Sequence, residues 1–498
     1  MRHVAIAASL TIVTIFASLT AAFGQAAPPR TQVFRGGGVA GTSVTPLGFY
    51  VGGGLICSAV APMVGTAILG REMTAVEVGR STLGCFLGPV GWWLGPVLFP
   101  DMVVAGRTRP HANPLRQGRG RNVNPPPPGE TRFVPNEVLL QIAGNASPRT
   151  IATIARRLQL THLETQSFAL TSRTVQRWRI DGNRSMAATL RALARYRAVL
   201  GAQPNYLYAL QQAAAAPSPQ AAEPMPDPAQ YVVGKLHLLQ AHRVSTGDAV
   251  AVAVIDSQID VDHPDLTGVV AEQFNALGGD GKPHEHGTAM AGAIAAHGKL
   301  IGVAPKVRLL AVRAFAGQGE SAAGTSFAIL KGLDWSAAQG ARIVNMSFAG
   351  PADPMLHEML AKAHVRGIVL VAAVGNAGPR SPPLYPAADR VVIGVTATDA
   401  DNKVLPLANR GTQVAIAAPG VHILADAPED SFAFTSGTSV AAAHVSGVAA
   451  LLLARRPHLT PVELRGVLVK SAQRIPGRRR DVGAGVVDAY GALERLAP

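Results

Sequence analysis

Four polar residues in the second half of the chain have the types that acyl transfer requires: Asp256, His286, Asn376 and Ser439. A serine hydroxyl is a weak nucleophile and needs an adjacent base. His286 can take its proton, and Asp256 can fix the imidazole tautomer and stabilise the imidazolium. The Asn376 amide, together with the backbone N–H of Ser439 at a helix start, can donate hydrogen bonds to a tetrahedral oxyanion. These residues therefore predict nucleophilic cleavage of an acyl bond.

The elements that would position these residues form an alternating pattern over residues 230–498. Strands are predicted before Asp256 (VAVAVI, 250–255) and before Asn376 (GIVLVAAVG, 367–375), and helices are predicted to start at His286 and Ser439. Further strands are expected at 307–315 and 341–348. Near-continuous apolar strands separated by helices indicate a mostly parallel α/β sheet with helices on both faces. Reactive groups of such enzymes lie at the C-terminal ends of the strands.

Local residues argue against two other hydrolase classes. His284 and Glu285 could begin the zinc-binding motif His-Glu-x-x-His. Its second histidine would be at position 288, which is Thr, so no metal ligands are assigned. No Gly-x-Ser-x-Gly motif surrounds Ser439, because Ala441 stands at its last position. This argues against an α/β-hydrolase esterase.

Residues 230–498 resemble the subtilisin-like serine proteases, or subtilases. The matching segments are AVIDSQIDVDHPDL, HGTAMAG, VNMSF, VAAVGNAGP and SGTSVAAAHVSGVAALL, and the order Asp, His, Ser is that of subtilisin. The resemblance implies an endopeptidase that acts on protein or peptide substrates with the four residues in the roles above. It also implies that Ser347, Phe348 and Ala349 line the substrate channel, partly by backbone pairing with an extended peptide.

Departures from the family pattern leave the four proposed reactive residues in place. Gln258 stands where a Gly is usual after Asp-Ser, Ala289 replaces the second His of His-Gly-Thr-His, and Val440 and Ala443 replace the usual Met and Pro. These changes concern turn geometry and specificity more than activity. No cofactor is required for this chemistry. Calcium is common in the family, and the sequence identifies no complete set of calcium ligands.

A basic unit at residues 131–210 is predicted to combine strands and helices. Strands are expected at 137–143, 174–180 and 206–210, and helices at 148–158 and 185–196. The unit resembles the propeptide of many subtilases, which implies an intramolecular chaperone and inhibitor whose last strand enters the active site like a product. An Ala/Pro-rich linker (211–229) follows, and self-cleavage is expected within 210–230. A permanent accessory domain is the alternative, because Pro-rich linkers also join stable domains.

The N-terminal region predicts export to the periplasm, the cell surface or the medium. Residues 1–27 have the polar start, apolar stretch and small residues of a signal peptide, with an uncleaved membrane anchor as the alternative. A Gly-rich apolar region (36–100) contains two uncharged stretches, 51–70 and 81–100, each long enough to span a bilayer. It predicts either a transmembrane hairpin or an apolar segment packed on itself or a partner. Cys57 and Cys85 could pair in an oxidising compartment, and a basic Pro-rich linker (101–130) follows.

The formal net charge of +14 is unevenly distributed. Residues 131–210 carry +8 (11 basic, 3 acidic), whereas residues 230–498 carry only +2 (24 basic, 22 acidic). No nucleic-acid motif or aromatic interleaving accompanies the basic residues, so nucleic-acid binding is not expected. The leading hypothesis is an exported, membrane-associated or free endopeptidase made as a zymogen. The alternative is a membrane-associated surface protein with an inactive protease-like binding domain, against which the four intact reactive residues argue.

Overall fold

The computed structural model describes residues 122–211, 230–317 and 322–496. We call residues 122–211 the α+β unit and residues 230–496 the C-terminal domain. The predicted signal peptide (1–27), the apolar region (36–100) with both cysteines, and most of the two predicted linkers lie outside the described residues.

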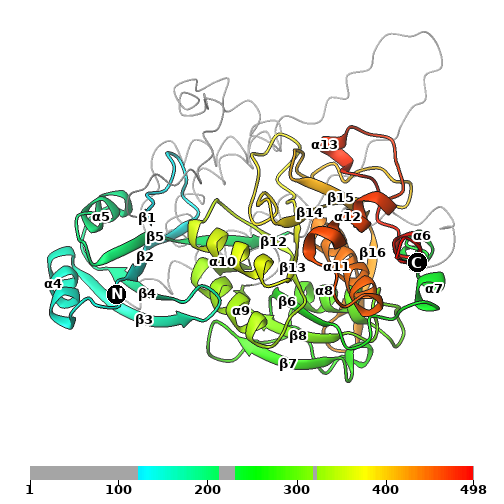
Figure 1. Cartoon of the computed structure of the whole chain (residues 1–498), viewed down its shortest axis with the longest axis horizontal. Coiled ribbons are helices and arrows are strands. Elements are labelled where there is room, and N and C mark those ends of the chain that lie inside the picture. Colours follow the sequence, from blue (N-terminus) through cyan, green and yellow to red (C-terminus); the bar gives the residue numbers. More distant parts are fainter. Residues whose placement is uncertain (1–121, 212–229, 318–321, 497–498) are drawn as a thin grey trace, which may run out of the picture. The chain divides into compact units, whose positions relative to one another are not determined.

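The C-terminal domain is built on a seven-stranded parallel sheet with the order β15-β14-β13-β11-β6-β8-β7 (Figure 1). Its strands, in chain order, are β6 (Ala251–Asp256), β7 (Val270–Asn275), β8 (Arg308–Arg313), β11 (Ile343–Met346), β13 (Val369–Ala373), β14 (Val392–Thr398) and β15 (Val414–Pro419). All neighbouring pairs are parallel. The inner strands are buried on both faces, as their near-continuous apolar sequences require.

Helices cover both faces of this sheet, which confirms the predicted fold class. Successive side chains of a strand point to opposite faces, and β6 shows the division: Val252 and Val254 join one hydrophobic core, Ala253 and Ile255 the other. The first core contains the helices α8 (Glu285–Ala295) and α11 (Thr438–Arg455), and the second contains α9 (Ser326–Ala338) and α10 (Pro354–Val365). Within the described residues, α11 alone is long and apolar enough to cross a membrane, and 89% of its apolar window is buried inside the protein.

Shorter elements complete the C-terminal domain. They are α6 (Val232–Lys235), α7 (Leu238–His242), the 3-10 helix η3 (Pro264–Leu266), β9 (Phe315–Ala316), β10 (Ala323–Thr325), β12 (Phe348–Ala349), β16 (Ile423–Ala427), β17 (Ser431–Thr435), α12 (Pro461–Ser471), α13 (Arg479–Val482) and α14 (Ala489–Glu494). Strands β16 and β17 form an antiparallel hairpin just before α11.

The α+β unit is a four-stranded antiparallel sheet, ordered β3-β4-β2-β5, that carries two helices. Its elements are β2 (Phe133–Ile142), α4 (Pro148–Leu158), β3 (Leu160–Phe168), β4 (Arg173–Ile180), α5 (Met186–Leu193) and β5 (Val199–Leu210). Ser147 and Ser185 cap the two helices by accepting backbone N–H groups at their first turns. Strand β3 was not predicted, because LTHLETQSF lacks a regular apolar alternation. Residues Asn122–Val123, from the predicted linker, form β1 and pair with β5.

The two faces of this four-stranded sheet have different partners. Val138, Leu140 and Trp178 pack with α4 and α5 in a separate hydrophobic core. Leu139 and Tyr206 point the opposite way and share a core with α9 and α10 of the C-terminal domain. The helices α4 and α5 therefore lie on the side of the unit that faces away from the C-terminal domain.

Polar contacts join the same two parts. The carboxylate of Asp334 accepts the backbone N–H of Leu170 at 2.7 Å. Two ion pairs cross the interface. Lys331 of the C-terminal domain pairs with Glu164 of the α+β unit at 2.8 Å, and Arg173 of the α+β unit pairs with Glu358 of the C-terminal domain at 3.6 Å. The basic unit is thus held by specific pairs in addition to apolar packing.

The α+β unit also supplies acceptors to the first turns of α9 and α10, whose N–H groups have no partner within their helices. Asn205 Oδ1 accepts from the N–H of Phe327, and Gln203 Oε1 accepts from the N–H of Met355, each at 3.1 Å. Gln203 also donates to Asp353 Oδ1 at 2.7 Å. Asp353 is buried, and burial raises the pKa of its carboxyl.

Two buried carboxyl groups lie beside α8. Asp265 accepts the backbone N–H groups of Lys299 and Leu300 at 2.8 and 2.7 Å. Asp426, on β16, is 1% exposed, and neither of its carboxyl oxygens has a hydrogen-bond partner among the described residues. Burial and, secondarily, the charge of Asp265 raise the pKa of Asp426 to about 7. Gly292 of α8 leaves the space that Asp426 occupies, because a Cβ there would overlap Asp426 Oδ2.

Candidate active site

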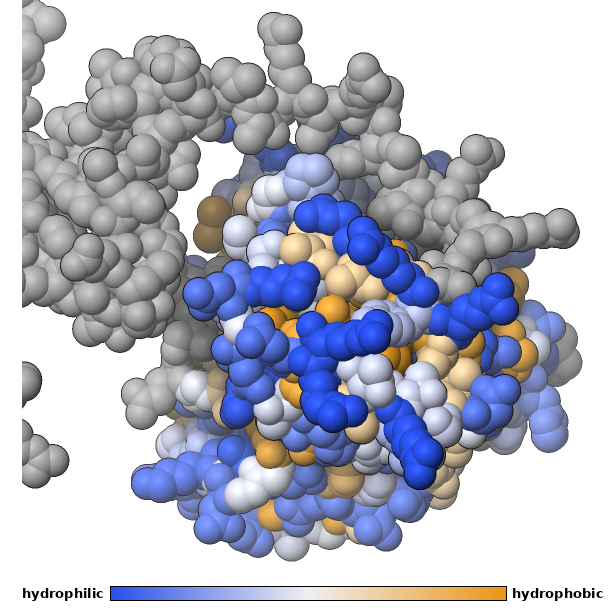
Figure 2. All heavy atoms as spheres, turned by 90° about the vertical axis from the view of Figure 1, so that its left-hand side faces the viewer, coloured by the Kyte–Doolittle hydropathy of each residue, from blue (hydrophilic) through white to orange (hydrophobic). Residues whose placement is uncertain are grey.

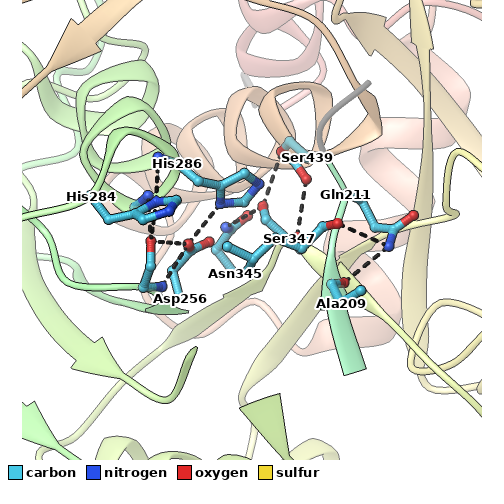
Figure 3. A network of polar contacts seen from close by, with 11 residues as sticks. Ala209, Gln211, Asp256, His284, His286, Asn345, Ser347 and Ser439 are labelled. Atoms are coloured by element: carbon cyan, nitrogen blue, oxygen red, sulfur yellow. Dashed lines mark hydrogen bonds and ion pairs between the residues drawn. The ribbon is translucent and has the colours of Figure 1, made fainter. Parts of the chain in front are cut away.

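Asp256 and His286 meet at the carboxyl end of the parallel sheet (Figure 3). Asp256 is the last residue of β6, and His286 lies in the first turn of α8. His286 Nδ1 and Asp256 Oδ1 are 2.7 Å apart, and both side chains are almost fully buried. Asp256 Oδ2 and His286 Nε2 have no hydrogen-bond partner among the described residues. The pair thus presents a buried imidazole whose second nitrogen is unused.

Ser257 and His284 brace this pair. The Ser257 N–H donates to Asp256 Oδ1 at 2.7 Å, and Ser257 Oγ accepts the N–H of Gly287 at 3.0 Å. His284 caps α8, because its Nδ1 accepts the backbone N–H of His286 at 3.1 Å. Burial, followed by the neighbouring His286, lowers the pKa of His284. A neutral His284 keeps Nδ1 available as the acceptor of the cap.

Ser439 lies in the first turn of α11, as predicted, and is buried. Its hydroxyl donates to the backbone carbonyl of Ser347 at 3.0 Å rather than to His286. A return bond runs from Ser347 Oγ to the carbonyl of Ser439 at 3.0 Å. Asn345, the next-to-last residue of β11, donates from Nδ2 to Ser347 Oγ at 2.9 Å, and its Oδ1 accepts from the hydroxyl of Ser446 of α11 at 2.9 Å. These contacts fix the start of α11 against the edge of the sheet.

Asn376 lies in the turn after β13, which ends at Ala373, and not at the strand end as the sequence predicted. Its Oδ1 accepts from both the N–H and the hydroxyl of Thr438, at 3.2 and 3.0 Å. These two bonds direct Nδ2 away from α11. Nδ2 donates to the backbone carbonyl of Gln211 at 2.7 Å. The amide is therefore already bound to a peptide carbonyl, whereas no bond from the Ser439 N–H to Gln211 occurs among the described residues.

The peptide that carries this carbonyl is the end of β5. It forms the middle strand between β10 and β12, antiparallel to both, with Ala209 opposite Ala349 and Leu210 opposite Phe348. The Gln211 N–H continues the pairing by donating to the carbonyl of Ser347 at 3.2 Å. All three residues predicted to line the channel thus pair with this segment, and β10 adds a second wall that was not predicted.

The side chain of Tyr208 fills a closed subsite. Tyr208 is 1% exposed, and its ring stands edge-on to Phe348 with the centroids 5.7 Å apart. Its hydroxyl donates to the carbonyl of Pro351 at 3.2 Å. Gly350 leaves room for this ring, because a Cβ at position 350 would overlap it. This enclosed space therefore holds a large aromatic side chain, that of Tyr208, three residues before Gln211.

Sequence reasoning missed several of these partners for different reasons. Ser257 and Thr438 are neighbours of predicted residues, so their proximity was available as a signal. Gln211 is separated by 165 residues from Asn376, and nothing in its local sequence marks it. Only the pairing of β5 with β12 brings these two residues together.

Comparisons with known proteins agree with this geometry. Residues 247–492 match the model of the Subtilase family, Peptidase_S8. Thermitase of Thermoactinomyces vulgaris is 33% identical over 273 residues, which are 53% of this chain and 96% of thermitase. Subtilisin DY of Bacillus licheniformis is 33% identical over 280 residues, which are 53% of this chain and 100% of that protein.

A solved structure shows the same fold. The crystal structure of fervidolysin from Fervidobacterium pennivorans, a keratinolytic enzyme related to subtilisin, aligns with a TM-score of 0.63 and 23% identity. The alignment covers 77% of this chain and 64% of fervidolysin, less than two thirds of its length. With the family match and relatives covered over nearly their whole length, the chain belongs to the subtilase family and is a subtilisin-like serine protease.

Proposed function

We propose that this protein is an exported serine endopeptidase made as a zymogen, with Asp256, His286 and Ser439 as the catalytic triad and Asn376 as an oxyanion donor. One observation carries the proposal: the Gln211 carbonyl oxygen lies 2.7 Å from Asn376 Nδ2, while the strand before it pairs with β10 at residues 207–209 and with β12 at residues 209–210. A peptide strand in this position presents its carbonyl carbon to the serine. The α+β unit is then the inhibitor, and residues 207–211 are its substrate-like end.

The proposed reaction follows from the hydrogen bonds at the site. Asp256 holds the proton on His286 Nδ1, which leaves Nε2 free to accept one. Ser439 Oγ turns from the Ser347 carbonyl to His286, transfers its proton and bonds to the peptide carbonyl carbon. The C=O electron pair moves onto oxygen, where the Asn376 amide stabilises it. Collapse of this intermediate breaks the C–N bond, and His286 returns the proton to the leaving amine. Water then hydrolyses the acyl-enzyme by the reverse sequence of proton transfers.

For the chain's own processing, this arrangement selects the Gln211–Gln212 bond. After cleavage, three sets of contacts keep the α+β unit bound: strand pairing at residues 207–211, the caps from Gln203 and Asn205, and the ion pairs of the interface. In the described state the Ser439 hydroxyl is bonded to Ser347 and not to His286. The α+β unit therefore inhibits by occupying both the channel and the oxyanion donor.

The test compares the wild-type chain with a Ser439→Ala variant. We expect the wild type to yield a fragment whose N-terminus is Gln212, identified by mass spectrometry, and the variant to stay uncut. Labelling with a fluorophosphonate probe, which reports an activated serine, should appear after the α+β unit is lost. An identical uncut band from both proteins contradicts self-processing, and a different new N-terminus contradicts the assignment of the bond.

Export rests on the apolar stretch at Val4–Phe23 and the small residues after it. We expect the protein to be recovered outside the cytoplasm, with its N-terminus near residues 24–27. Cell fractionation followed by N-terminal sequencing checks both points. Recovery of full-length protein in the cytoplasmic fraction would contradict export.

A further inference from the structure

The α+β unit has a large excess of unpaired positive charge. Its described residues include eleven arginines, no lysine and four acidic residues. Every acidic residue is already paired with an arginine: Glu130 with Arg132, Glu137 and Glu164 with Arg177, and Asp181 with Arg179. Arg173 pairs with Glu358 of the C-terminal domain. Seven arginines remain without an ion-pair partner among the described residues: Arg149, Arg156, Arg157, Arg184, Arg191, Arg195 and Arg197.

These seven arginines, which we call the arginine face, belong to α4, α5 and the residues that flank them. All seven are exposed. Helix α4 illustrates their orientation, because it buries Ile154 and Leu158 against the sheet while Arg156 and Arg157 stay in solvent. The protease packs on the opposite side of that sheet. Figure 2 turns the end of the molecule with α4 and α5 toward the viewer, and strongly hydrophilic side chains gather across it.

An array of this kind matches a partner that presents many phosphates over an area. A guanidinium group binds phosphate oxygens in a bidentate manner and is weakly hydrated, so arginine favours such contacts. Single-stranded nucleic acids are usually bound with aromatic stacking platforms, and the arginine face has no exposed aromatic residue. The sequence also places two uncharged stretches of membrane-spanning length, 51–70 and 81–100, just before this unit.

We propose that the arginine face docks the zymogen on an anionic phospholipid bilayer. Residues 230–498 carry a formal charge of only +2, so this attraction resides in the α+β unit and not in the protease. Processing at Gln211–Gln212 then leaves the membrane-binding charge on the pro-unit. The protease leaves the surface when the two parts separate, a consequence that rests on the proposed self-cleavage.

The test uses the full-length Ser439→Ala protein, which stays in one piece, and vesicles of phosphatidylcholine with or without phosphatidylglycerol. One variant replaces Arg156, Arg157, Arg191 and Arg195 with Gln. The matched control replaces four exposed, unpaired arginines of the C-terminal domain with Gln: Arg455, Arg456, Arg474 and Arg479. We expect the first variant to bind anionic vesicles about 10²–10³-fold more weakly and the control to bind nearly as the parent does. Added salt should weaken the parent's binding.

Equal vesicle binding by the two variants overturns the proposal, as does binding that does not depend on phosphatidylglycerol. The proposal is also overturned if the parent binds a DNA duplex but not the vesicles, and the arginine-face variant loses the DNA binding. That result assigns the arginine face to nucleic acid. When the same two sets of substitutions are made in the chain that retains Ser439, both variants should cleave themselves at the wild-type rate. This result shows that they fold. Docking of the uncut protein is measured without cleavage, so its failure is distinguishable from failure of the zymogen proposal.

Discussion

Replacing Asp426 with Asn should stabilise the protein at neutral and alkaline pH. Asp426 is buried beside Asp265 with no hydrogen-bond partner among the described residues, and its pKa is raised from 3.8 to about 7. The unfolded chain releases this proton near the ordinary value, whereas the folded protein keeps it up to about pH 7. The folded state therefore binds more protons across that interval. Its stability falls as the pH rises through it and levels off above the folded pKa.

The shift from 3.8 to about 7 corresponds to a loss of about 4 kcal/mol in the free energy of unfolding. Somewhat more than half, roughly 2–3 kcal/mol, falls between about pH 5 and about pH 8. That amount corresponds to roughly 5–10 °C in the midpoint of thermal unfolding. An Asn at position 426 does not titrate, and its NH₂ group can donate to the Asp265 carboxylate. The variant should therefore lack this loss.

The measurement is thermal unfolding followed by circular dichroism in the Ser439→Ala background, which prevents autolysis. The difference in midpoint between Asp426→Asn and its parent should be small near pH 5 and grow toward pH 8. Asp430→Asn is the matched control, because Asp430 is an exposed carboxyl on the same hairpin. A pH-independent difference, or one equal to that of Asp430→Asn, would show that Asp426 is already ionised in the folded protein.

The remaining predictions concern the active site and its inhibitor. Asn376→Ala in the processed enzyme should lower kcat by about 10²–10³-fold with little change in KM, because the amide stabilises the oxyanion; a change confined to KM in peptide hydrolysis would assign it to substrate binding. Gly350→Ala should lower kcat/KM for peptides with Tyr at the position of Tyr208 more than for peptides with Ala there, because the added Cβ overlaps the ring; equal losses would exclude this subsite. Asn205→Ala should leave the Phe327 N–H uncapped and weaken inhibition by the processed pro-unit about 5-fold, since a lost cap costs about 1 kcal/mol. The exposed Asn183→Ala serves as its control in progress curves of peptide hydrolysis.

The elements that carry the candidate catalytic residues were predictable, because most of these residues have a recognisable local setting. Asp256 follows a continuous apolar strand, and Ser439 starts a long uncharged helix, so a parallel sheet with covered faces had to gather them at one edge. The family resemblance supplied Ser347, Phe348 and Ala349 as channel residues, and all three pair with residues 209–211 in the structure. The position of Asn376 was predicted less well, since β13 ends three residues earlier.

In the α+β unit, too, some elements were predicted from the local sequence and others were missed. Helix α4 was predicted with its observed limits, because Ser147, Pro148 and the apolar spacing that follows are strong local signals. Strand β3 was missed, since its burial comes from neighbours in the sheet and is not visible as an alternation in its own residues. The sequence gives the net positive charge of this unit, but it does not identify the seven arginines that lack an ion-pair partner. Their lack of partners depends on which residues pair in the folded protein.

By itself, the sequence determined the parts of this protein: a buried parallel sheet, four candidate catalytic residues at or near the ends of its elements, and a basic unit before them. Those properties depend on composition and spacing within short segments. Only the tertiary structure decided which backbone carbonyl lies at Asn376. That choice depends on the register between β5 and β12, and a register shift of one residue would place a different carbonyl at Asn376. Contacts between residues more than a hundred positions apart are set by the packing of whole elements, which no local pattern encodes.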